Sequence, residues 1–120
     1  MDVDYDALLP KVLESMFPDE LERKSIKEKL NLYGQESFHV EIPRVRMGIL
    51  KLVYNEPEKI DAFVELACCD FRDLLCASEY PETSQRWGLK ENNPKKYKIL
   101  SIKEENEYLD WLENVMHENK

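Results

Sequence analysis

Apolar side chains recur at helical spacing along most of this chain, and the longest such run lies between residues 57 and 80. Its apolar and small positions are Ile60, Phe63, Val64, Ala67, Phe71, Leu74, Leu75 and Ser78. Steps of three and four residues, kept for about five turns, predict one amphipathic helix. Asn55 and Pro57 are typical of a helix start and Pro81 of a stop, so we expect this helix at the centre of the fold.

Three other segments show the same period. Residues 7–17 predict a first helix with Asp6 as its cap. A thinner apolar stripe predicts a second, surface helix that begins near Asp19 and ends at Gly34. Pro43 can open a third helix, which is apolar nearly all round and is therefore expected inside the bundle.

The last helix is predicted to begin at Ser101, because Ser101 and Glu104 stand at capping-box spacing ahead of an apolar run. Before it, between residues 81 and 100, the helical period disappears around Gly88 and the Asn-Asn-Pro sequence at 92–94. These residues favour turns, and they predict a long irregular loop.

These elements predict an all-α fold. Residues 1–120 should form a single domain, a bundle of about five helices with a long irregular loop before the C-terminal helix. The central helix is expected to pack against the third. The first and last helices should close the core through Tyr5, Leu9, Met16, Tyr108 and Leu112. The segments HVEI and KYKIL could pair briefly, although neither is a convincing strand.

Length and composition are those of one ordered domain. The chain has 120 residues, and an apolar fraction of 42% is too high for a disordered segment. No apolar run approaches the roughly 20 residues that span a bilayer, and the acidic N-terminus differs from a signal peptide. We therefore expect a cytoplasmic protein without membrane contact. Cys68, Cys69 and Cys76 lie on one predicted helix and are odd in number, which predicts free thiols.

Charge is distributed unevenly. The formal net charge of −8 argues against nucleic-acid binding, and the acidic helices could instead meet a basic protein partner. Only residues 81–103 are strongly basic, with a net charge of +4 and an aromatic candidate, Trp87. Their cations are Arg86, Lys90, Lys95, Lys96, Lys98 and Lys103. This segment is either a binding surface or a loop lying across the acidic helices on either side, with modest ion pairing.

Few residues suggest chemistry. Arg72 and Asp73, with Asp70 one turn away, could place two carboxylates beside a guanidinium, or could form an ordinary solvated helix face. Glu79 and Tyr80 precede Pro81, where they could aim binding groups at the helix end or simply terminate the helix.

Metal and nucleophile signatures are weaker still. Cys68 and Cys69 are adjacent, which is not metal-ligand spacing, and His39 and His117 lie far away in the sequence. We predict no metal and no cofactor, and a packing role for the cysteines.

One resemblance can be stated on these residues. The run F-R-D-L-L-C-A-S-E-Y-P at 71–81, followed by Trp87 and by Y-L-D-W-L at 108–112, resembles a family of short uncharacterised bacterial proteins with an R-D-x-L, A-E-Y-P and Y-x-x-W-L pattern. Ser78 stands where that pattern has Ala. The family has no assigned activity, so the resemblance implies a small bacterial helical domain and no reaction or ligand.

Two functions follow as hypotheses. The first is a cytoplasmic protein–protein interaction module, such as an adaptor, inhibitor or immunity-like protein, because the chain is short, acidic and without a recognisable catalytic arrangement. The alternative is a small enzyme or ligand-binding protein. Its site would be formed by Arg72, Asp73, Glu79, Tyr80, Arg86 and Trp87.

Overall fold

The computed structural model describes residues 3–117, which form seven α-helices, two short 3-10 turns and no strand. The α-helices are α1 (Tyr5–Met16), α2 (Glu20–Leu30), α3 (Ile42–Val53), α4 (Ile60–Cys69), α5 (Phe71–Glu79), α6 (Leu89–Asn92) and α7 (Pro94–His117). The 3-10 turns are η1 (Pro57–Lys59) and η2 (Thr83–Gln85). The all-α prediction is confirmed, with more helices than the five expected.

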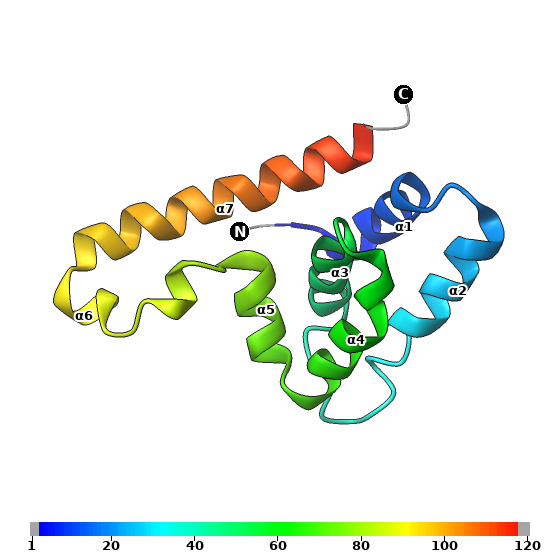
Figure 1. The fold of residues 1–120 in the computed structure, drawn as a ribbon, viewed down its shortest axis with the longest axis horizontal. Coiled ribbons are helices and arrows are strands. Elements are labelled where there is room, and N and C mark those ends of the chain that lie inside the picture. Colours follow the sequence, from blue (N-terminus) through cyan, green and yellow to red (C-terminus); the bar gives the residue numbers. More distant parts are fainter. Residues whose placement is uncertain (1–2, 118–120) are drawn as a thin grey trace.

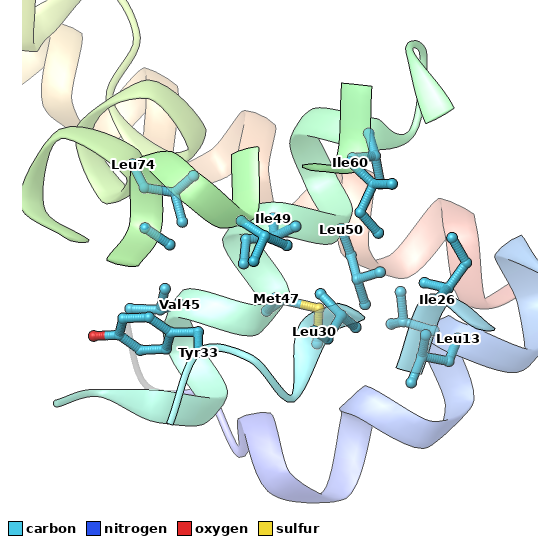
Figure 2. Packing of buried hydrophobic residues seen from close by; sticks show 14 of the residues in the cluster. Leu13, Ile26, Leu30, Tyr33, Val45, Met47, Ile49, Leu50, Ile60 and Leu74 are labelled. Carbon is cyan, nitrogen blue, oxygen red and sulfur yellow. The ribbon is translucent and has the colours of Figure 1, made fainter. Parts of the chain in front are cut away.

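The third helix lies inside the bundle, as its apolar pattern predicted, and it takes the central place that we expected for the helix over residues 57–80. Val45, Met47, Ile49 and Leu50 of α3 are all fully buried, and α1, α4 and α5 pack around them (Figure 2). The last helix closes this core against α1, with Tyr108 and Leu112 buried in the contact. The predicted packing of the first helix against the last is therefore confirmed, although Tyr5, Leu9 and Met16 are only half-buried.

The predicted helix over residues 57–80 is wrong as a single element, because the chain breaks at Asp70. The Asp70 N–H donates to the Leu66 carbonyl and ends α4, while its backbone turns to φ −155° and ψ 89°. Its carboxylate then accepts from the N–H groups of Arg72 and Asp73 at 3.2 and 3.3 Å, which caps α5. Asp70 thus ends one helix and begins the next.

The expected start of the last helix at Ser101 is also wrong. Asn93 caps α7 by accepting from the Lys96 N–H at 3.1 Å, and Pro94 takes the first helical position. Ser101 lies inside the helix, where its hydroxyl donates to the Tyr97 carbonyl at 2.8 Å. Instead of one long irregular loop, residues 81–100 contain η2, α6 and the first two turns of α7.

Smaller boundary differences have similar causes. The cap of α1 is Asp4, which accepts from the Ala7 N–H at 3.2 Å, instead of Asp6. Asp19 caps α2 as predicted, but α2 ends at Leu30, four residues before Gly34. Pro57 opens η1, and the residue at its cap position is Glu56 instead of Asn55.

Residues 81–103, which we call the arm, project beyond the end of α5 and away from α1–α4 (Figure 1). The arm consists of η2, α6 and the first part of α7, with α6 packed on α7. It accounts for the elongated outline of 49 × 36 × 25 Å. Between residues 84 and 99 only Leu89 and Tyr97 are even half-buried. The arm therefore has little core of its own.

Candidate functional site

The C-terminal end of α5 carries a buried ion pair. Glu79 is 1% exposed, and its two carboxylate oxygens accept from Nε and Nη2 of Arg44, on the first turn of α3, at 2.8 and 2.5 Å. Hydrogen bonding to Glu79 raises the pKa of Arg44, so the guanidinium stays charged. A bidentate pair of this geometry neutralises the buried carboxylate and joins α3 to α5.

Two tyrosines lie beside this pair. Burial raises the pKa of Tyr5, and the negative charge of Glu79 raises it further. Burial also raises the pKa of Tyr108, with contributions from Tyr5 and Glu79. Both phenols are therefore protonated at neutral pH and unsuited to act as bases. This cluster is a closed polar core and not a reactive centre.

The base of the arm is fixed to α7 by two carboxylates. Glu104 is 4% exposed and accepts from the N–H groups of Glu82 and Thr83 at 2.9 and 2.7 Å, and from the Thr83 hydroxyl. Next to it, the Tyr80 hydroxyl donates to Glu105 at 2.6 Å. The pKa of Tyr80 is raised by burial and by this hydrogen bond. These contacts set where the arm leaves the core.

The structure does not gather the six predicted site residues. Arg72 and Asp73 are exposed on the first turn of α5, with the Arg72 guanidinium over the Phe71 ring. Glu79 and Tyr80 lie at the other end of this helix, about 10 Å along its axis.

The other two predicted residues lie farther along the chain, on the arm. Arg86 forms an exposed ion pair with Glu82, and the neighbouring Trp87 is 96% exposed. The six residues therefore lie as three separate sequence-adjacent pairs, and Glu79 and Tyr80 already have partners within the fold.

A surface groove of about 460 Å³ lies between α5, α6 and the start of α7. Its lining consists of Tyr80, Lys90, Pro94, Tyr97, Lys98, Ser101, Ile102 and Glu105. The Lys90 ammonium lies 5.8 Å from the centroid of the Tyr97 ring, which is within cation–π range. The groove therefore joins apolar side chains to cationic ones.

Exposed apolar side chains and cations occur together along the arm, and we call the exposed side chains of residues 84–102 the outer surface of the arm. Trp87, Ile99 and Ile102 are 96%, 61% and 47% exposed. Most of the arm's lysines make no ion pair with a carboxylate among residues 3–117; these are Lys90, Lys95, Lys96 and Lys98. Lys103 pairs with Glu107 on the same helix. The basic segment therefore does not lie across α4 and α5 as an electrostatic strap.

Two of the three cysteines have less reactive thiols than a free cysteine. Burial raises the pKa of Cys68 and of Cys76, which lowers the thiolate fraction that a nucleophile needs. All three thiols are free. No group of three or more potential metal ligands comes together within residues 3–117. In the same residues, no helix is long and apolar enough to cross a bilayer.

No family model, no curated protein and no solved structure matches this chain.

Sequence reasoning identified some of these residues and missed others. Trp87 and the arm lysines stood out by composition alone. Arg44 and Glu104 did not, because their partners are distant in the sequence. Arg44 and Glu79 are 35 residues apart, and Glu104 lies 22 and 21 residues after Glu82 and Thr83. A clue to Arg44 did exist, since a cation on the first turn of a largely buried helix needs a partner.

Proposed function

We propose that this protein is a protein–protein interaction module that binds an acidic, partly apolar segment of a partner through the outer surface of the arm. The observation that carries the proposal is Trp87, which is 96% exposed on a projecting element. A tryptophan in this position leaves a large apolar area in water, and tryptophan is among the residues that most often dominate binding energy at interfaces.

The charge of the arm favours an acidic partner. The arm has a net charge of +4, and the lysines around Ile99 and Tyr97 have no carboxylate partner among the described residues. Complementary charge on a partner would raise the association rate, while burial of Trp87 and Ile102 would supply affinity. The acidic faces of α4 and α5 are a separate surface, to which a basic partner remains our prediction from the sequence.

An interaction role also agrees with what the buried polar groups do. Glu79 and Glu104 are paired or hydrogen-bonded within the fold, so neither presents an unused charge to a substrate. The enzyme or ligand-site alternative requires Arg72 and Arg86 to meet Glu79, and the distance along α5 opposes that arrangement. We therefore favour the interaction module, with adaptor, inhibitor and immunity-like roles as its subclasses.

The test compares Trp87→Ala with a matched control, Leu21→Ala. Leu21 is 80% exposed on α2, outside the arm, so its truncation removes a similar exposed apolar side chain. Tagged wild-type and variant proteins capture partners from nuclease-treated lysate of the source cells. A captured protein is then purified and titrated calorimetrically. We expect Trp87→Ala to weaken binding by about 30-fold or more, as a hot-spot residue would, and Leu21→Ala to leave it unchanged.

Two results would contradict the proposal. A partner that binds wild type and Trp87→Ala equally well does not use this surface. If the purified protein instead binds a single-stranded oligonucleotide through Trp87 and the lysines, the arm is a nucleic-acid surface, which stacking and phosphate contacts could also produce. Circular dichroism of each variant establishes that the fold is intact.

A further inference from the structure

A second, separate feature lies on the other side of the core, where α1, α2 and α3 meet. These helices line a cavity of about 200 Å³ that is open to solvent on one side. Of its lining residues, Leu13 and Leu30 are buried and Leu9 is half-buried, so these leucines form its apolar floor. At about 30 Å³ per water, the cavity has the volume of about seven water molecules, or of an alkyl or ring group of about six to eight non-hydrogen atoms. That is smaller than the pockets that bind drug-sized molecules.

The mouth of the cavity is polar and carries two cations, Arg46 from α3 and Lys27 from α2. Arg46 is held in place because Nε and Nη2 both donate to the Tyr33 carbonyl, at 3.1 and 2.8 Å. Burial lowers the pKa of Arg46, which records partial desolvation of its guanidinium. Neither cation forms an ion pair within residues 3–117, although Asp6 also lines the mouth.

We propose that this cavity binds a small apolar carboxylate, with its hydrocarbon part on the leucine floor and its carboxylate against Arg46 and Lys27. A partly desolvated guanidinium without a carboxylate partner is an incomplete ion pair, and an anionic ligand would complete it. The fixed orientation of Arg46 favours binding, because little side-chain freedom remains to be lost. The two cations outnumber Asp6, so the local charge favours an anion.

A neighbouring groove adjoins the cavity. It has a volume of about 400 Å³ and shares Pro10, Leu13 and Lys27 with the cavity lining. A longer ligand could therefore extend along the seam between α1 and α2. The same chemistry is found in a free short-chain acid and in a peptide chain that ends in an apolar residue with a free carboxylate.

The test is an NMR titration of ¹⁵N-labelled full-length protein with hexanoate. Two probes separate the contributions: 1-hexanol has the chain without the charge, and acetate has the charge without the chain. We expect saturable shifts at the amides of Leu9, Leu30 and Asn31 with hexanoate, and binding at least tenfold weaker with either of the other two. A tenfold change in affinity is about what is lost when one hydrogen bond between the ligand and a charged group is removed.

Variants identify the anion site. Arg46→Lys keeps the charge but loses the guanidinium, and Lys27→Gln neutralises an exposed side chain that has no ion-pair partner among the described residues. Arg46→Lys should weaken hexanoate binding by about tenfold and Lys27→Gln, whose ammonium is exposed, by about two- to fivefold, whereas Lys11→Gln, an exposed cation of α1 outside the cavity, should not. Because Arg46→Lys could also disturb the Tyr33 contact, Lys27→Gln is the decisive variant.

Equal binding of hexanol and hexanoate would overturn the proposal, as would the absence of saturable shifts at the cavity. Unchanged binding by Lys27→Gln would also overturn the assigned anion site. A short peptide ending in leucine, compared with its C-terminal amide, distinguishes the ligand sources. Tighter binding of the free-carboxylate peptide than of hexanoate indicates a chain end, and the reverse indicates a free acid. Trp87→Ala should leave all these titrations unchanged, so this proposal and the arm interaction can fail separately.

Discussion

Gly48 and Ser78 face each other where α3 crosses α5. A Cβ atom added at Gly48 would lie 2.8 Å from the Ser78 Oγ and 3.4 Å from its Cβ. Ser78 is fully buried, so it has little room to move. Alanine favours a helix over glycine by about 1 kcal/mol, but overpacking a buried contact costs about 1–3 kcal/mol. We expect Gly48→Ala to lower the free energy of unfolding, measured by urea denaturation.

A double variant shows whether the Ser78 hydroxyl is the cause. Ser78→Ala removes Oγ, which is the atom in closest contact, and leaves only the 3.4 Å approach of the Cβ. Gly48→Ala with Ser78→Ala should therefore recover part of the lost stability. If Gly48→Ala alone stabilises the protein, the two helices are not held at a distance that only glycine permits.

The Arg44–Glu79 pair predicts that a single and a double variant differ in stability. Arg44→Ala leaves the Glu79 carboxylate buried without a partner, which costs about 3–5 kcal/mol. The double variant Arg44→Ala with Glu79→Gln removes the buried charge as well, so its free energy of unfolding should fall clearly less. Chemical unfolding of both variants at pH 7 measures the difference. A loss below about 1 kcal/mol for Arg44→Ala would be that of an exposed surface pair and would contradict the buried geometry.

At the scale of elements, the break at Asp70 explains why a continuous apolar period did not give a continuous helix. Leu74, Leu75 and Ser78 continue the period of Val64 and Ala67, and all five are buried as predicted. The period records which side chains are buried, but it does not record whether the backbone hydrogen bonds continue between them. Only the capping residue carries that information, and Asp is common both at caps and on exposed helix faces.

The cap at Asp70 can be tested directly. Asp70→Ala removes the acceptor for two N–H groups of α5 and should lower the free energy of unfolding by about 1 kcal/mol. Glu65→Ala, at an exposed position inside α4, is the matched control and should change stability by less than about 0.5 kcal/mol. Thermal and urea unfolding of both variants decide the point. Equal effects would mean that the cap adds nothing beyond the loss of an exposed carboxylate.

The arm is a further element, and Glu104 is the buried one of the two carboxylates that fix its base. Glu104→Gln keeps the shape of the side chain but weakens its hydrogen bonds to the N–H groups of Glu82 and Thr83. A hydrogen bond to a charged group contributes about 1.5–3 kcal/mol, so hydrogen exchange at Thr83 should become at least tenfold faster. Exchange at buried amides of α3 should change far less. Glu107→Gln, an exposed position one turn later, is the control.

At the scale of the whole molecule, the sequence showed which segment is basic but not where that segment lies in the fold. Counting charges identified residues 81–103 as the basic segment, and Trp87 as its aromatic member. It could not predict that the segment projects, because this depends on the start of α7 at Pro94 and on the distant contacts of Glu104. The Asn93–Pro94 pair was a usable helix-start signal, although such a pair is equally typical of a turn. Local patterns alone therefore did not decide between a turn and a helix start at this pair.

The tyrosines together predict how the molecule responds to alkali. Burial raises the pKa of Tyr5, Tyr33, Tyr80 and Tyr108 above the usual value of 10.0. Above pH 10 the unfolded chain therefore releases tyrosine protons that the folded protein still holds. The stabilising contribution of these groups is complete below about pH 10 and is lost as pH rises toward their folded-state pKa values. Unfolding by urea should become easier from about pH 10 upward.

Tyr80→Phe isolates one part of this response. Tyr80 donates to Glu105, and that hydrogen bond is available only while the phenol is protonated. The variant should lose some stability at pH 7, when the hydrogen bond is removed, and should lose stability less steeply above pH 10 than wild type does, because one raised pKa is missing. Urea midpoints between pH 7 and 11, with tyrosinate absorbance of the folded protein read in parallel, measure both effects. A wild-type stability that stays level through pH 11, or a Tyr80→Phe curve as steep as that of wild type, would place the Tyr80 hydroxyl in a more solvated environment than its contact with Glu105 indicates.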